Sequence, residues 1–116
     1  MIDTLNLIAM LLTIAFGLIG YLAPRFTMKQ LGLKTDGSNM GYSEIRAANG
    51  ALFVGVGAGA LFLSTPAAFV MVGFLYVGAA LGRITGIIFD NAGSRKSWSY
   101  FGAEALLAGY LLIANL

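Results

Sequence analysis

The residues of this chain that could carry chemistry are charged side chains inside apolar segments. Arg83 lies seven residues before Asp90, and Glu104 lies six residues after Trp98. At about 1.5 Å of helical rise per residue, both would lie at similar depth, roughly 10 Å from the same rim of a bilayer. A lone charge in hydrocarbon costs at least about 2.5 kcal/mol, so two opposite charges at equal depth should face each other. The sequence therefore predicts an ion pair between Arg83 and Glu104.

Further polar residues fall at the same end of the apolar segments. Arg46 and Asn49 are three residues apart and share one helical face, while Asp90 shares a face with Arg83. We expect one polar cluster in the cytoplasmic half of the protein, formed by Glu44, Arg46, Asn49, Arg83, Asp90 and Glu104. Two interpretations are open: a site for an anionic headgroup, a small substrate or a proton, or an ion-pair network that fixes helix register.

Composition limits the other chemistry. The 116 residues contain no cysteine and no histidine, which argues against disulfides, thiol nucleophiles, haem ligation by either residue and the usual zinc sites. We therefore predict no catalytic residue, no metal and no cofactor. The net charge of +2 is spread over loops and helix ends, so the sequence pI of about 9.2 does not indicate nucleic-acid binding.

The elements that position these residues are four apolar segments. The chain is 59% hydrophobic, 10% charged and has a mean hydropathy of +0.85, which a soluble domain of this size could not bury. We predict an all-α integral membrane four-helix bundle of antiparallel up-down hairpins, in a single domain over residues 1–116. The expected spans are about 4–23, 45–63, 67–89 and 98–116.

The connections predict the orientation. Residues 24–43 and 90–97 hold every loop lysine and arginine, whereas the tight reversal at 64–66 and both ends of the chain hold none. By the positive-inside rule these two loops are cytoplasmic and both termini lie outside, in a multi-pass protein of the cell inner (plasma) membrane. Pro24 suits the first turn of a short interfacial helix that Gly32 would end, and residues 34–41 are typical of a turn.

Glycines are expected to pack the helices together. Small residues spaced by four let helix backbones approach closely in lipid. Two such stripes occur, one on each of the middle spans. Helix packing is predicted at Gly55, Gly59, Gly78, Gly82 and Gly86. Contact between helices of one chain and contact with a second subunit are both open.

The sequence also resembles a known family. An acidic-x-Arg-Ala opening at Glu44 and Arg46, a Gly-Arg at Arg83 and a glutamate at Glu104 are similar to small bacterial four-helix membrane proteins of unknown function (DUF4345-like, related to the DoxX-like group). The resemblance covers nearly the whole chain and implies the four-helix fold and the polar cluster, with no activity. The Arg-Ala-Ala-Asn stretch beginning at Arg46 faintly resembles the glutathione-binding helix of membrane-associated eicosanoid and glutathione enzymes, without their further acidic residue.

Three function classes follow. We favour a non-catalytic accessory subunit, or a subunit that binds lipid or a small ligand, because the chain has no soluble domain and no nucleophile arrangement. The first alternative is a small oligomeric transporter with Glu104 or Glu44 as its coupling carboxylate, although segment 4–23 lacks the acidic residue that small multidrug exporters carry there. A membrane-embedded enzyme using Glu104 as acid or base comes last. Expected partners are membrane lipids and either a larger membrane complex or further copies of the chain, with no nucleic acid.

Overall fold

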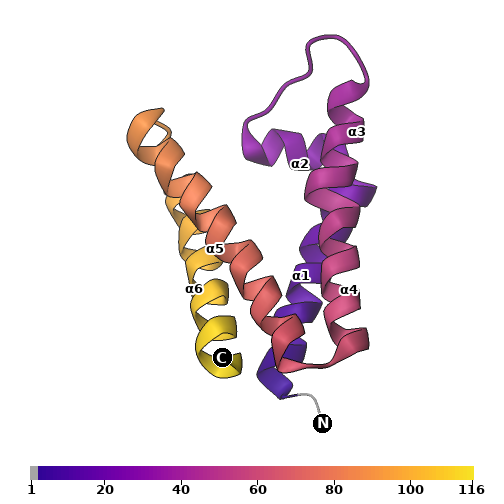
Figure 1. Ribbon diagram of the computed structural model, residues 1–116. Coiled ribbons are helices and arrows are strands. Elements are labelled where there is room, and N and C mark those ends of the chain that lie inside the picture. Colours follow the sequence, from indigo (N-terminus) through magenta and orange to yellow (C-terminus); the bar gives the residue numbers. More distant parts are fainter. Residues whose placement is uncertain (1–2) are drawn as a thin grey trace. The chain divides into compact units, whose positions relative to one another are not determined.

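The computed structural model describes residues 3–116, and these residues form helices joined by short connections with no strand among them (Figure 1). The chain divides into two compact units, a first of Met1–Leu63 and a second of Ser64–Leu116. The all-α prediction is confirmed. The prediction that residues 1–116 form a single domain stays a prediction.

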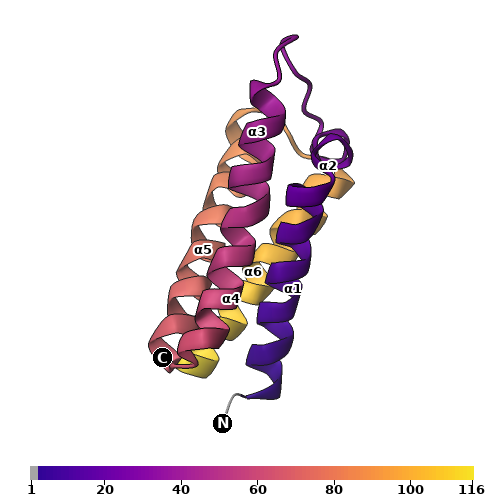
Figure 2. The ribbon, with the colours of Figure 1, turned by 90° about the vertical axis from the view of Figure 1, so that its right-hand side faces the viewer.

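The first unit is a helical hairpin with a short helix across its connection. Helix α1 (Thr4–Leu22) lies beside a long return helix that is made of α3 (Met40–Arg46), the π-helical turn η1 (Ala47–Ala51) and α4 (Leu52–Leu63) (Figures 1 and 2). Asp3 caps α1, since its side chain accepts a hydrogen bond from the Leu5 N–H at 2.8 Å. Met10 and Thr13 of α1 are fully buried.

Helix α2 (Pro24–Leu31) occupies the connection of this hairpin, as the sequence predicts. Pro24 stands at its first position, where a missing N–H costs no hydrogen bond. Gly32 ends the helix in the left-handed region with φ of 72°, and the Leu33 N–H donates to the Met28 carbonyl at 2.8 Å. The Thr27 hydroxyl donates to the Ala23 carbonyl at 3.0 Å and ties α2 to the end of α1.

The second unit is a simple hairpin of α5 (Pro66–Phe89) and α6 (Arg95–Asn115), which lie side by side in antiparallel directions (Figures 1 and 2). Each helix begins at a side-chain cap: Thr65 accepts from the Ala68 N–H at 3.2 Å, and Ser94 accepts from the Ser97 N–H at 3.1 Å. Leu111 of α6 is fully buried.

Two helices begin before the predicted spans, whose own bounds stay a prediction. The return helix of the first unit begins at Met40, whereas the predicted span begins at about residue 45, because its first turn includes polar residues such as Ser43 and Glu44. The last helix begins at Arg95 instead of residue 98, because Ser94 provides a cap, so the polar turn is shorter than the predicted 90–97. A search for apolar runs does not detect polar residues at the end of a helix.

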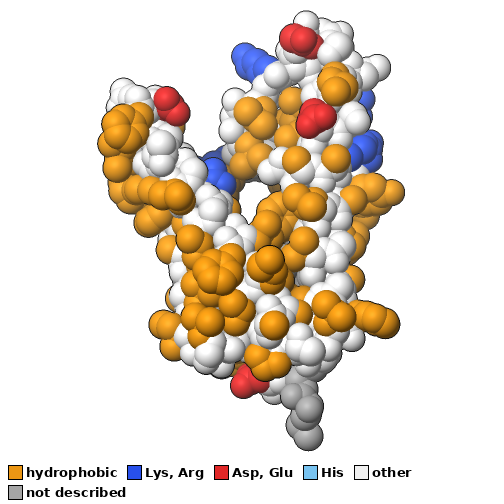
Figure 3. Space-filling view, viewed as in Figure 1, with side chains coloured by type: hydrophobic (Ala, Val, Ile, Leu, Met, Phe, Trp, Pro, Cys, Tyr) orange, Lys and Arg blue, Asp and Glu red, His pale blue; other side chains and the backbone are white. Residues whose placement is uncertain are grey.

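Three of the helical segments are long and apolar enough to cross a membrane, namely Thr4–Leu22, Met40–Leu63 and Pro66–Phe89. Large apolar side chains on these segments are exposed, including Phe62 at 89% and Met71 at 68%. Figure 3 shows hydrophobic side chains along the helices of each unit and charged side chains mostly toward the helix ends. A surface of this kind suits lipid better than water.

Candidate functional site

The central feature of the second unit is an ion pair between α5 and α6. Arg83 Nε donates to Glu104 Oε1 at 2.9 Å, and Arg83 Nη2 donates to Glu104 Oε2 at 3.0 Å. Both carboxylate oxygens are therefore bound in the two-pronged geometry that guanidinium and carboxylate groups favour. The pairing predicted from equal depth and opposite sign is confirmed.

Tyr100 completes this pair on one side. It lies one helical turn before Glu104 on α6, and the Arg83 guanidinium carbon is 5.1 Å from the centre of its ring. A cation at this distance from an aromatic ring is attracted by the electrons of the ring face. The side chains of Arg83 and Glu104 keep 30% and 18% of their surface exposed, so a polar group could still approach the pair from outside the hairpin.

The first unit uses its arginine differently. Arg46 Nη1 donates to the main-chain carbonyl of Tyr21 at 2.6 Å, near the end of α1 where the last carbonyls have no helical partner. A cation there also interacts favourably with the helix dipole. Arg46 thus joins the return helix to the end of α1, a contact that the sequence did not predict.

The other predicted cluster residues are spread over both units. Glu44 is exposed at the start of the return helix, and Asn49 is half-buried in η1. Asp90 is exposed and caps the end of α5, where its N–H donates to the Gly86 carbonyl at 2.9 Å. Three cluster residues belong to each unit, so the single six-residue cluster stays a prediction. Within the second unit, Arg83 and Glu104 of this cluster are in contact.

The model of a family described as a domain of unknown function (DUF4345) matches residues 3–115. The chain belongs to this family. The curated proteins and the solved structures that were compared give no match. Membership of DUF4345 confirms the resemblance drawn from Glu44, Arg46, Arg83 and Glu104, and leaves the activity to be argued from the site.

The glycines of this DUF4345 member divide into two groups, and the five predicted packing glycines belong to the group without close contacts inside the hairpins. A Cβ added at Gly55, Gly59, Gly78 or Gly82 would meet nothing within 4 Å, and at Gly86 it would meet only the Asp90 carboxylate at 3.7 Å. A repeat of four marks one face of a helix and does not say which face meets the neighbour. Packing of these five glycines against another helix stays a prediction.

The glycines in tight contact are others. A Cβ on Gly17 would lie 2.7 Å from the Gly50 oxygen, and a Cβ on Gly50 would lie 2.5 Å from the Tyr21 nitrogen. The main chains of α1 and η1 therefore touch, and a Cβ on Gly20 would collide with the backbone of Asn49. In the second unit, a Cβ on Gly73 would lie 3.0 Å from a methyl group of Leu112. The signal available in the sequence was the pair of small residues Gly17 and Gly20 in the first apolar run.

No group of three or more histidine, cysteine, aspartate or glutamate side chains in residues 3–116 is arranged to hold a metal ion. The acidic residues lie on separate elements, and the carboxylate of Glu104 is bound by Arg83. What the described site offers is one planar cation and one carboxylate that neutralise each other, beside a tyrosine ring.

Proposed function

We propose that this chain is a multi-pass membrane protein whose four long helices all cross the bilayer as a four-helix bundle. Three segments have the length and apolar character to cross. Helix α6 has 21 residues, which at about 1.5 Å per residue is sufficient for the ~30 Å hydrocarbon core. Its mean hydropathy is lowered by polar residues such as Glu104 and Asn115.

The Arg83–Glu104 pair supports the crossing of α6. A single carboxylate would make insertion of α6 costly, and a single guanidinium would do the same for α5. Bound to each other through two hydrogen bonds, the two groups present far less uncompensated charge to lipid. The pair thus explains how a hairpin with two intramembrane charges could be stable in a bilayer.

In this proposal α2 lies at the cytoplasmic surface of the inner membrane. Its buried side includes Met28, whereas Phe26 is 55% exposed and available to the lipid interface. Arg25, Lys29 and Lys34 then lie on the cytoplasmic side together with Arg95 and Lys96, as the positive-inside rule requires, and both termini lie outside. The glycine face of α5, which lacks a neighbour inside its own unit, would meet another helix of the bundle or a second subunit.

We infer that the function is non-catalytic: the chain serves as an accessory subunit or binds a lipid or small ligand at the Arg83–Glu104–Tyr100 site. The observation that carries this is the two-pronged ion pair with its partial exposure. A coupling carboxylate in a transporter, or a general acid or base in an enzyme, must exchange protons with a substrate or water. Here both Glu104 oxygens are bound by Arg83, which favours a recognition or structural role.

The test is purification of the full chain in mild detergent, followed by mass spectrometry of the lipids and proteins that accompany it. The comparison protein carries Arg83→Met with Glu104→Leu, which removes both charges together and leaves no unpaired ion. We expect the unmodified chain to keep a lipid or membrane partner at fixed stoichiometry that the double variant loses while retaining its helical content. Retention of the same partner by a folded double variant would show that the pair serves only the fold.

A further inference from the structure

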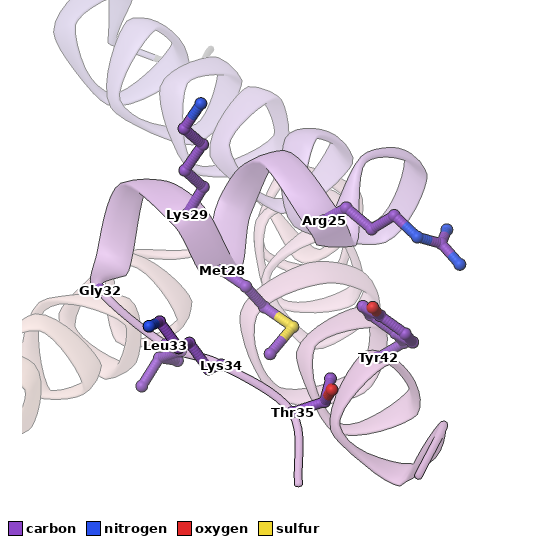
Figure 4. Close-up of a pocket in the computed structure, with 8 residues that line it drawn as sticks. All are labelled: Arg25, Met28, Lys29, Gly32, Leu33, Lys34, Thr35 and Tyr42. Carbon is purple, nitrogen blue, oxygen red and sulfur yellow. The ribbon is translucent and has the colours of Figure 1, made fainter. Parts of the chain in front are cut away.

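A second site lies in the first unit, far along the chain from the ion pair. A cavity of about 520 Å³, wide open to the surface, lies between α2, the connection that follows it and the start of α3 (Figure 4). This volume falls in the usual range for small-molecule sites. Its lining residues are Arg25, Met28, Lys29, Gly32, Leu33, Lys34, Thr35 and Tyr42. Three of these eight are cations and none is an acid.

The positive charge of this cavity is not neutralised within the described chain. The ammonium groups of Lys29 and Lys34 make no ion pair or hydrogen bond among residues 3–116. The acidic side chain nearest in sequence to Lys34 is Asp36, but its Oδ1 accepts hydrogen bonds from the Ser38 N–H at 3.0 Å and hydroxyl at 2.8 Å. These bonds lower the pKa of Asp36 and hold its carboxylate within its own turn.

The walls of the cavity are defined by contacts that do not depend on a ligand. The Arg25 guanidinium carbon lies 4.4 Å from the centre of the Tyr42 ring, which joins α2 to α3. Figure 4 shows Met28 pointing between Thr35 and Tyr42, while Lys29 extends from the opposite side of α2 and Lys34 lies on the connection. The cavity therefore has Met28 in its interior and Lys34 on the connection beside it, while the Lys29 ammonium group points away and must turn over α2 to reach a bound anion. The four-carbon lysine stem is long enough for such a turn.

We propose that this cavity binds the phosphate-bearing headgroup of an anionic phospholipid. This site is different from the proposed one at Arg83. The inference depends on the proposed function only for the placement of the chain in a membrane. Helix α2 starts directly after α1, one of the three segments able to cross a membrane, so the cavity lies where headgroups meet the end of that segment. Cations near an anionic membrane surface attract its lipids, and the apolar side chains Met28 and Leu33 suit the glycerol and upper acyl region.

The experiment uses the full chain in detergent and measures binding of dioleoylphosphatidylglycerol and of dioleoylphosphatidylcholine by native mass spectrometry. Both lipids carry a phosphodiester and the same acyl chains, but only the first has a net negative charge. The test variant is Lys29→Gln with Lys34→Gln, since neither ammonium group holds the fold. The control is Arg95→Gln with Lys96→Gln, which removes two cations from the first turn of α6. Thermal melting verifies that each variant is folded.

We expect the unmodified chain and the control to prefer phosphatidylglycerol. The test variant should bind it about 25-fold more weakly, from about fivefold for each lost cation. An equal loss in both variants would reduce the effect to diffuse surface attraction and overturn the proposal. Displacement of the lipid by millimolar inorganic phosphate would overturn it in favour of a soluble anion.

The membrane placement is checked separately, so the two failures are distinguishable. Release of the chain from cell membranes by alkaline carbonate would contradict the membrane proposal, whatever the lipid result. A chain that requires detergent for release but shows no lipid preference would contradict the headgroup site alone.

Discussion

The two hairpins of this molecule are closed by different kinds of contact. In the first, α1 and η1 touch through their main chains, with Gly17, Gly20 and Gly50 at the contact. In the second, α5 and α6 are joined by the side chains of Arg83 and Glu104. Packed apolar side chains close both hairpins, Leu111 being fully buried in the second. The first adds contact between main chains, and the second adds an ion pair. The two hairpins should therefore respond differently to substitution.

The π-helical turn is part of this difference. Single π turns often interrupt α-helices where a function or a close contact requires it. Here η1 is the part of the return helix whose Gly50 meets Tyr21 of α1, and it directly follows Arg46, which donates to the Tyr21 carbonyl. The second hairpin has two uninterrupted α-helices, and its glycine contact at Gly73 is with leucine side chains instead of main chain.

The largest effect is expected from breaking the ion pair of the second hairpin. Glu104→Gln or Arg83→Met alone leaves one part-buried charge without its partner, and such losses commonly cost about 3 to 5 kcal/mol. The double variant Arg83→Met with Glu104→Leu should recover much of that stability, because it leaves no unpaired charge. Unfolding in mixed detergent, followed by circular dichroism, measures all three. If the two single losses simply add in the double variant, the pair does not couple α5 to α6.

The next effect tests the main-chain contact of the first hairpin. Gly50→Ala would place a Cβ 2.5 Å from the Tyr21 nitrogen, and since main-chain atoms cannot turn aside, we expect a loss of about 1 to 3 kcal/mol. Gly55→Ala is the matched control on the same return helix, where an added Cβ meets nothing within 4 Å. There alanine should stabilise the helix by about 0.5 to 1 kcal/mol.

The two alanine variants should therefore shift the detergent melting temperature in opposite directions. A loss of similar size in both would mean that the glycine face of α4 is itself packed against another helix. A neutral Gly50→Ala would mean that α1 and η1 can separate without cost, and the contrast between the hairpins would fail.

These contacts differ in how far the sequence could predict them. The pairing of Arg83 with Glu104 was predictable, because opposite charges at equal depth in apolar helices have few other partners. The ends of α2 were predictable as well, since Pro24 and Gly32 are residues with strong positional preferences. Both inferences depend on local residue chemistry and on distance along a helix.

The glycine contacts were not predictable in the same way. The small residues Gly78 and Gly82 show that one face of α5 allows a neighbouring helix to approach closely. Which helix lies against that face depends on how each helix is rotated about its axis. Gly50 touches α1 through η1, and the residues of η1 have no composition that distinguishes a π turn from an α turn. The role of Arg46 had the same difficulty, since its partner is a main-chain carbonyl that every residue possesses.

The smallest effect concerns Arg46 and decides between its two interpretations. Arg46→Gln removes a charged donor from the Tyr21 carbonyl near the end of α1, and because the side chain is exposed we expect a loss of only about 1 kcal/mol. Arg46→Lys should restore part of it, since an ammonium group keeps the charge but not the planar donor. Arg95→Gln is the control, because Arg95 stands in the first turn of α6, where a cation gains nothing from the helix dipole.

A small loss of stability in Arg46→Gln with unchanged lipid and partner content would assign Arg46 to the fold. Unchanged stability with loss of a bound lipid or partner would instead assign Arg46 to recognition, and the first hairpin would then contain a functional cation comparable to Arg83 in the second.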